Sequence, residues 1–433
     1  MADTKILLNY KRNGKSHTLE SYLARDGYKT LAQAGKKFQP DDVLNEVKKS
    51  AIRGRGGAGF PAGLKWSFLA KDTGKPTYLL CNADEGEPGT FKDRVILEEN
   101  PHQLIEGIVL SAFAIHAAHA YIYIRGEYGF AVRRVQAAVD EAYQAGYLGK
   151  KLNGTDYIPH ITVHRGAGAY VVGDETGLMN SIEGKKGQTR IKPPFPAVEG
   201  LYGCPTIINN VETLASVPYI VQHGGDTYHK IGTDKSSGTK LFCVSGHVRK
   251  PGVYEVEMGY PLMELLSKQC GGIVDRRKLK AVIPGGSSTP VLRAEQCEKL
   301  KLDYESISAA GSSLGSGAVM VIAEGTCMVK TLEVLAHFYH HESCGQCTPC
   351  REGTGWLYKI VKRIESGNGK MEDIDELTRI TKHIAGFTIC PLGDAACGPI
   401  DSFVKQFRDE FEEHVKQRRC PFGGKFTRFQ QRV

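Results

Sequence analysis

Apolar residues in the first half of the chain alternate between helical and strand spacing. A stripe at the period of a helix comes first, and its members are Leu44, Val47, Ala51 and Ile52. Short apolar runs typical of strands follow at 78–81, 119–125 and 161–164, with helical patterns near 101–118 and 130–145. Strands that alternate with helices form βαβ units, so this half predicts an α/β fold with a mostly parallel sheet.

The second half of the chain predicts two further kinds of structure. A small α+β module is indicated by strands at 241–245, 253–258, 279–283 and 319–323 and a helix at 262–269. From Cys327 onward, four apolar stripes at helical spacing predict a helical bundle. The stripes are Leu332, Leu335, Ala336 and Tyr339; Trp356, Leu357, Ile360 and Ile364; Ile374, Leu377, Ile380 and Ile384; and Phe403, Phe407, Phe411 and Val415.

These patterns divide the 433 residues into four expected parts. They are an N-terminal helical region at 1–52, an α/β domain at 53–235, the α+β module at 238–325 and the helical bundle at 326–433. Turn-forming and charged residues at 224–238 mark the boundary between the second and third parts.

Composition and charge narrow the function classes. Hydrophobic content of 41% and charged content of 24% are ordinary for a soluble globular protein. The net charge of +8 suits an anionic ligand or an acidic partner, and no DNA- or RNA-binding motif accompanies the basic end, so we expect no nucleic-acid binding. Glu106, His116 and His119 interrupt the most apolar region, so we expect no membrane insertion. The start of the chain has neither a signal nor a transit pattern.

The twelve cysteines are unevenly spread, and three of them form a C-x2-C-x2-C run. Cys344, Cys347 and Cys350 have the ligand spacing of a [4Fe–4S] cluster, and Cys390, followed by proline, is the natural fourth ligand. Zinc is the rival, although structural zinc sites usually draw their cysteines from two separated pairs. Unconnected thiols are the remaining alternative. Clustered cysteines in a chain of this length indicate a reducing compartment rather than a disulfide scaffold.

The segment 54–68 has five glycines in its first ten residues and formally contains G-x-G-x-x-G. The dinucleotide motif of that form follows a strand, whereas a helix is expected here before the glycines. Glycines nevertheless let a backbone approach a flat or phosphorylated ligand and turn its amides toward it. A flexible loop without a ligand is the alternative.

Two other loops follow expected strands. The strand at 78–81 runs into the acidic loop 82–89, and ligands of open α/β sheets lie beyond the carboxyl ends of strands. The run Asn209-Asn210-Val211-Glu212-Thr213 has the pattern of a helix start whose amides would hold a phosphate. Helix capping alone is the alternative there.

Taken together, the glycine loop, 81–89, 192–196, 209–213 and 343–350 resemble the NADH-binding flavoprotein subunit of respiratory complex I, an NADH:quinone oxidoreductase. Diaphorase subunits of NAD-reducing hydrogenases and formate dehydrogenases are close relatives. The resemblance implies a modified Rossmann-like FMN domain, a ubiquitin-like β-grasp (SLBB) module and a four-helix bundle that carries a [4Fe–4S] cluster. Its chemistry would be hydride transfer from NADH to FMN, followed by single-electron transfer through the cluster to partner subunits and finally to quinone.

The resemblance also implies particular contacts. FMN contacts fall on Gly54, Gly56, Lys65, Asn82, Asp84, Glu85, Tyr170, Gly173, Asp174, Glu175, Asn209, Asn210 and Thr213. NADH contacts fall on Phe60, Phe68, Glu87, Lys192 and Phe195, and cluster ligands on Cys344, Cys347, Cys350 and Cys390. No side chain would act as a catalytic proton shuttle, whereas Glu87 and Glu175 would tune the cofactor's surroundings.

Two departures from the family pattern stand out. Asp174 occupies a position where the family usually has a glutamate, and Cys397 competes with Cys390 as the fourth ligand. The implied partners are a thioredoxin-like [2Fe–2S] subunit and a large iron–sulfur subunit, on the cytoplasmic side of a bacterial inner membrane. Two alternative functions remain, a diaphorase subunit of a hydrogenase or formate dehydrogenase and a zinc-stabilised binding scaffold.

Overall fold

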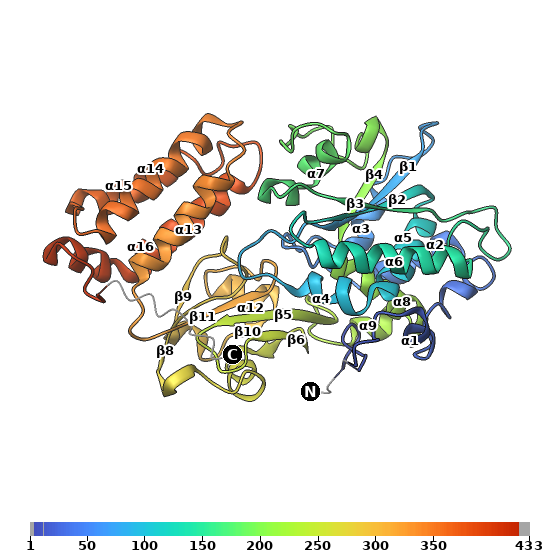
Figure 1. Ribbon diagram of the computed structural model, residues 1–433, viewed down its shortest axis with the longest axis horizontal. Coiled ribbons are helices and arrows are strands. Elements are labelled where there is room, and N and C mark those ends of the chain that lie inside the picture. The colour runs from blue at the N-terminus through green and yellow to red at the C-terminus, as the bar shows by residue number, and fades with distance from the viewer. Residues whose placement is uncertain (1–3, 12, 424–433) are drawn as a thin grey trace.

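The computed structural model describes residues 4–11 and 13–423. Figure 1 shows a helical bundle at one end of the molecule, an α/β part at the other end and a second, β-rich part along the lower edge between them. Among the described residues, no helix is both long enough and apolar enough to span a membrane.

Four parallel strands form the sheet of the α/β part, as the alternating pattern predicted. They are β1 (Thr77–Ala83), β2 (Ala117–Ile124), β3 (Ile161–Arg165) and β4 (Thr206–Asn210), in the order β3-β2-β1-β4. Leu79, Leu80 and Cys81 of β1 are all fully buried, because β1 is a central strand with packed layers on both faces. The carboxyl ends of β1 and β4 lie side by side, with Asn82 paired in register with Asn210.

Helices cover both faces of this sheet. One face packs on α5 (Pro101–Ala114), α6 (Gly129–Ala145) and α8 (Val211–His223), and the other on α7 (Glu175–Ile182) and the 3₁₀ turn Tyr170–Gly173. Every residue of α5 is buried, including Glu106, whose carboxylate accepts hydrogen bonds from the amides of Tyr28 and Leu31, each at 2.9 Å. The most apolar stretch of the chain is therefore the central helix of this part.

Shorter helices complete the α/β part. They are α1 (Leu19–Leu23), the 3₁₀ turn Leu31–Gln33, α2 (Pro40–Lys49), α3 (Ala62–Ser67), α4 (Lys92–Glu99), the 3₁₀ turn Leu201–Gly203 and α9 (Gly225–His229). The helix α2 precedes the glycine loop, as the apolar stripe predicted. The expected helix at 101–118 ends earlier, at Ala114, and β2 begins at Ala117.

A mixed five-stranded sheet forms the β-rich part. Its strands are β5 (Thr239–Gly246), β6 (Gly252–Glu257), β8 (Leu279–Ile283), β9 (Leu292–Arg293) and β11 (Ala318–Ala323), in the order β6-β5-β11-β8-β9. Only the β5–β11 pair is parallel. Around this sheet lie β7 (Tyr260–Pro261) paired with β10 (Lys301–Leu302), and α10 (Leu262–Glu264), the π-helical segment Leu265–Gln269, the 3₁₀ turn Val274–Arg276, α11 (Ala294–Cys297) and α12 (Tyr304–Ala309).

The bundle contains α13 (Met328–Glu342), α14 (Thr348–Glu365), α15 (Met371–Thr381) and α16 (Leu392–Gln417). Phe403, Phe407 and Phe411 of α16 are buried as their spacing predicted, and non-helical dihedrals at Phe407 (φ −131°, ψ 30°) kink the helix there. The expectation for Trp356 was wrong. Its side chain is 53% exposed, because the buried face of α14 runs through Leu357, and Trp356 lies outside it.

Candidate functional site

Arg55 fixes the glycine-rich segment 54–68, called the glycine loop, to the rest of the protein. The Arg55 side chain is fully buried, and its Nη2 donates to the carbonyls of Ser237 (2.7 Å) and Thr239 (3.0 Å). Its backbone amide donates to Thr213 Oγ1 at 2.9 Å, which ties the loop to the first turn of α8. A Cβ on Gly56 would lie 3.1 Å from Asn210 Cβ, so a side chain here would push the loop away from α8. The loop therefore rests directly on the helix start.

An unpartnered carboxylate oxygen lies at the end of β1. Asn82 Nδ2 donates to the Gly173 carbonyl at 2.9 Å, and Asn82 Oδ1 accepts from the Asp84 amide at 3.1 Å. Asp84 Oδ2 is buried and has no hydrogen-bond partner among the described residues. Burial raises the pKa of the Asp84 carboxyl to about 7, although Arg125 opposes the rise. An oxygen in this condition needs a donor that the protein does not supply.

Glycines leave room beside that oxygen. A Cβ on Gly86 would lie 3.3 Å from the Tyr170 ring and 3.7 Å from Asp84 Oδ2, and a Cβ on Gly173 would lie 3.8 Å from the same oxygen. We call the backbone surface formed by the glycine loop, the ends of β1 and β4 and the turn at Tyr170–Gly173 the cradle. Its free acceptor and bare backbone fit a flat ligand with ring N–H groups.

Several residues expected to touch FMN use their side chains inside the protein. Glu85 accepts from the amides of Asp93 (2.8 Å) and Arg94 (3.0 Å) at the start of α4, and burial raises the pKa of its carboxyl to about 7. The others bond similarly, with Asp174 Oδ1 capping α7 at the Thr176 amide (2.9 Å), Asn210 Oδ1 capping α8 at the Glu212 amide (3.0 Å) and Asn209 Oδ1 accepting from Trp66 Nε1 (2.7 Å). These side chains hold the elements that frame the cradle.

Glu175 lies between two lysines at the rim. Its carboxylate is 2.9 Å from Lys65 Nζ and 2.6 Å from Lys192 Nζ, and all three side chains are partly buried. Burial alone would raise the pKa of the Glu175 carboxyl, but Lys65 and then Lys192 outweigh it and hold the pKa below its ordinary value. The two lysines outnumber the one carboxylate, so the group is cationic overall, which suits a phosphorylated ligand.

A network of buried charged side chains, which the sequence did not predict, lies next to the cradle. Glu212 is fully buried, 2.9 Å from Lys92 Nζ and 3.4 Å from Lys240 Nζ, and Lys92 also pairs with Asp93 at 2.7 Å. Burial lowers the pKa of Lys240 to about 8, whereas the pKa of Lys92 is raised because Asp93, Glu212 and Glu85 together outweigh burial. The network links α4 and α8 to β5. The only sequence signal for this network is that Glu212 belongs to the motif 209–213.

A second polar network joins all three parts of the molecule. Glu87 accepts from Tyr170 Oη at 2.6 Å and from the Ser288 amide at 2.7 Å. Ser287 Oγ lies 3.1 Å from Glu87 and 2.7 Å from Tyr339 Oη of α13. The loop at 287–288 and Tyr339 were not expected near the site, because nothing in their local sequence distinguishes them.

Aromatic side chains are exposed beside the glycine loop. Phe60 and Phe68 are 46% and 56% exposed, with ring centroids 6.1 Å apart and planes inclined at 48°. Phe195, on the segment that carries Lys192, is 58% exposed. Large apolar side chains exposed together mark a surface for an apolar or flat ligand.

The four predicted cluster ligands come together. Cys344, Cys347, Cys350 and Cys390 line one small cavity, as do Thr189, Ser343, Gln346, Thr388 and Leu392. Ile389 N donates to Cys347 Sγ at 3.3 Å, and Ser343 Oγ lies 3.2 Å from Cys350 Sγ. Burial, followed by the neighbouring thiols, raises the pKa of Cys350. Four sulfur donors around one hollow, with polar donors directed at two of them, fit an iron–sulfur cluster.

The cluster cavity borders the cradle. Cys350 and Leu392 belong to the same buried apolar group as Val171, Val172 and Leu178, which follow or lie within the turn that carries Tyr170 and Gly173. Cys397, the competing ligand, does not line the cavity. Its thiol lies 3.6 Å from the Thr381 carbonyl inside the bundle.

Known protein families match most of the chain. Residues 47–219 match the Nuo51 FMN-binding domain, residues 240–321 the SLBB domain and residues 330–414 the NADH-ubiquinone oxidoreductase-F iron-sulfur binding region. The chain is 54% identical over 406 residues to an NADH-quinone oxidoreductase F subunit of Rhizobium meliloti, covering 94% of this chain and 96% of that one. It is 52% identical over 405 residues to the mitochondrial NADH dehydrogenase [ubiquinone] flavoprotein 1 of Dictyostelium discoideum, covering 92% and 84%.

A solved structure is also similar. A chain of an NAD+-reducing [NiFe]-hydrogenase in the H2-reduced state superposes with a TM-score of 0.82 at 35% identity. The match covers 93% of this chain and 66% of that chain.

Proposed function

Because the chain belongs to the family of NADH-quinone oxidoreductase F subunits, the NADH-oxidising FMN and [4Fe–4S] subunit of complex I, we propose that the cradle holds the FMN and the four-cysteine cavity holds the cluster. When bound, FMN accepts a hydride from NADH and releases the two electrons singly to the cluster. The observation that carries this assignment is that the turn Tyr170–Gly173 contacts both the cradle and the residues that line the four-cysteine cavity.

We divide the FMN residues into two groups by their contacts. Gly54, Gly56, Lys65, Asn82, Asp84, Tyr170, Gly173 and Glu175 line the cradle or its rim and face the cofactor. Glu85, Asp174, Asn209, Asn210 and Thr213 act through the elements they hold, since their side chains already bond within the protein. Asp84 Oδ2 accepts a hydrogen bond from the cofactor, because it is the buried acceptor without a partner among the described residues.

NADH enters beside the glycine loop in this proposal. Phe60 and Phe68 stack on its adenine, since both rings are exposed on the rim of the cradle. Lys192 and Phe195 contact the nucleotide from the opposite segment. Glu87, fixed by Tyr170 and the Ser288 amide, accepts hydrogen bonds from the substrate with its remaining lone pairs.

The thiols of Cys344, Cys347, Cys350 and Cys390 ligate the cluster as thiolates. The Ile389 amide and the Ser343 hydroxyl stabilise that charge, because hydrogen bonds to sulfur favour the thiolate form. The position of Cys397, bonded to Thr381 away from the cavity, supports Cys390 as the fourth ligand.

The finer setting of the protein is also part of the proposal. We infer that it passes electrons to a thioredoxin-like [2Fe–2S] subunit and a large iron–sulfur subunit on the cytoplasmic side of the inner membrane. The division at 1–52, 53–235, 238–325 and 326–433 is the proposed domain organisation. The relatives at 50–54% identity are complex I subunits, whereas the hydrogenase chain is 35% identical, which favours complex I over a diaphorase. Because the chain belongs to this family, we discard the alternative of a zinc-stabilised binding scaffold.

One pair of variants tests the site assignment. Cys390→Ser is expected to lose the cluster iron and its low-temperature EPR signal, while bound FMN is retained and still reduced by NADH. Cys397→Ser is the matched control, another cysteine of the bundle whose thiol is buried, and is expected to retain both cofactors. Full iron in Cys390→Ser, or loss of iron in Cys397→Ser, would reassign the fourth ligand.

A further inference from the structure

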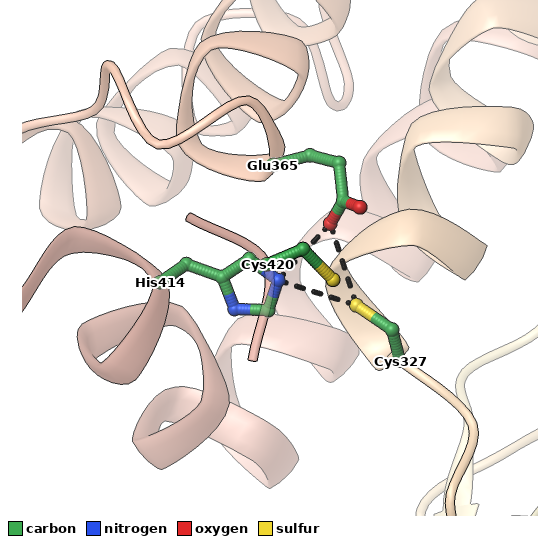
Figure 2. A group of neighbouring side chains, drawn as sticks. All are labelled: Cys327, Glu365, His414 and Cys420. Carbon is green, nitrogen blue, oxygen red and sulfur yellow. Dashed lines mark hydrogen bonds and ion pairs between the residues drawn. The ribbon is translucent and has the colours of Figure 1, made fainter. Parts of the chain in front are cut away.

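Figure 2 shows four side chains with metal-binding atoms that converge where α13 begins and α14 ends. They are Cys327 before α13, Glu365 at the end of α14, His414 in α16 and Cys420 after it, and their ligand atoms all lie within 4.8 Å of one another. Cys327 and Ser343 flank the fifteen residues of α13, a length of roughly 22 Å. This group is therefore separate from the cavity lined by Cys344 and Cys350.

The spacing of these atoms is that of ligands around one ion. Cys327 Sγ lies 3.3 Å from Glu365 Oε2 and 3.3 Å from His414 Nε2, and that nitrogen lies 3.0 Å from Glu365 Oε2. A tetrahedral zinc with ordinary bond lengths places its S, N and O ligands about 3.3–3.8 Å apart. These three distances are close to coordination distances, and Cys420 Sγ lies within 4.8 Å of each of the three atoms, so small side-chain shifts would complete the site.

The orientation of His414 favours a cation at the centre of the group. Its ring is fully buried, and Nδ1 lies 2.6 Å from the Glu410 carbonyl, to which it must donate. Nε2 is then the ring nitrogen directed at Glu365 Oε2 and Cys327 Sγ. A histidine held through its other nitrogen by a carbonyl is the usual arrangement of a metal ligand.

The chain is shaped to bring Cys420 to this place. Arg418 has a left-handed backbone (φ 51°) and ends α16. A Cβ on Gly367 would lie 2.1 Å from the Arg418 carbonyl oxygen, so only glycine lets the segment after α16 pass this closely over the end of α14. Phe422 then packs on the bundle core, and the centroid of its ring lies 4.7 Å from Lys280 Nζ. The cysteine therefore sits on a fixed turn.

We propose that Cys327, Glu365, His414 and Cys420 bind one Zn²⁺ ion that fastens the segment after α16 to the ends of α13 and α14. Two sulfurs, one imidazole nitrogen and one carboxylate oxygen form a donor set that zinc takes in tetrahedral sites. All four positions are filled by protein, which makes the site structural rather than catalytic. Cys327 Sγ also accepts from the Lys330 amide at 3.2 Å, a contact that stabilises a metal-bound thiolate.

Metal analysis of the full chain, with its FMN and iron in place, tests the site. The wild type and Cys397→Ser are supplied with Zn²⁺ and desalted, alongside Cys420→Ser and His414→Gln. We expect one zinc per chain in the first two proteins and none in the last two, with the same iron content in all four. Zinc-edge X-ray absorption of the wild type is expected to show a mixed shell of sulfur and nitrogen or oxygen.

Thermal unfolding gives a second readout. A chelator is expected to lower the Tm of the wild type to that of Cys420→Ser and to leave Cys420→Ser unchanged, because only the wild type holds the ion. Cys420 is only partly buried, so its serine variant keeps the bundle core intact even where His414→Gln does not fold. No zinc in the wild type, equal zinc in the wild type and Cys420→Ser, or an all-sulfur shell would overturn the proposal. The first two outcomes leave the FMN and cluster assignments untouched, whereas an all-sulfur shell would place zinc in the four-cysteine cavity and would count against the cluster there.

Discussion

Asp84→Asn is expected to stabilise the cofactor-free protein and to weaken FMN binding. Asp84 is partly buried, its Oδ2 is buried and unpartnered among the described residues, and burial raises the pKa of the carboxyl from 3.8 to about 7. That difference corresponds to about 4 kcal/mol between its two protonation states, an upper limit for what ionised Asp84 costs the fold. Asparagine has the same shape and no charge, so it removes this cost.

The pH dependence follows from the direction of the shift. Between pH 4 and pH 7 the folded protein binds a proton at Asp84 that the unfolded chain has released, so the stability contributed by this group is lost as the pH rises through 7. The advantage of Asp84→Asn should therefore fall from at most about 4 kcal/mol at pH 8 to about 2 kcal/mol at pH 5. Excess FMN should reduce this advantage by about 1.4–2.7 kcal/mol, because loss of a charged acceptor weakens FMN binding by about 10- to 100-fold.

Thermal unfolding of the FMN-free chain at pH 5 and pH 8, and FMN titration monitored by flavin fluorescence, measure both effects. Asp156→Asn is the matched control, because Asp156 is exposed, pairs with Lys151 at 2.5 Å and has a pKa below its ordinary value. It should gain nothing at either pH. The reasoning fails if Asp84→Asn is no more stable than the wild type at pH 8, or if its advantage is the same at pH 5.

Three further variants probe other contacts. Glu212→Gln should lower the free energy of unfolding by about 3–5 kcal/mol, because Lys240 and Lys92 lose a buried counter-charge. An unchanged Tm would show that stability does not depend on this network. Glu87→Gln should raise the KM for NADH several-fold in an assay with an artificial acceptor, and unchanged KM and kcat would count against its proposed contact. Phe68→Ala should raise the same KM about tenfold through lost stacking, with FMN content unchanged as the internal check.

Periodic patterns and short motifs in the sequence predicted most of the fold and much of the candidate site. The stripes of α13 to α16 and the alternation of strands with helices depend on local spacing, which a single sequence displays directly. The run Cys344, Cys347 and Cys350 is equally local. Short helices such as α3 and α7 were not predicted, since a helix of six or eight residues offers too few positions for a period to emerge.

The buried charges could not be predicted in the same way. Lys92, Glu212 and Lys240 are far apart in the chain, and charged residues are ordinarily found at the surface. Arg55 belongs in the sequence to the glycine loop that favours a ligand, yet its guanidinium points into the protein toward Ser237 and Thr239. Each of these charges is buried because a partner distant in sequence compensates it, and a single sequence does not reveal such partners.

The turn at Tyr170–Gly173 lies between the two cofactor sites that we propose. On one side Tyr170 and Gly173 line the cradle, and on the other Val171 and Val172 pack against the group that includes Cys350. Tyr170 is held further by Glu87 and, through its amide, by Glu342 at the end of α13 at 3.1 Å. The four residues of this turn thus lie between the cradle and the four-cysteine cavity. Because electron transfer depends on distance, this short and firmly bonded turn would set the path between the two cofactors in the proposed assignment. We expect a looser contact here to slow transfer without altering either site.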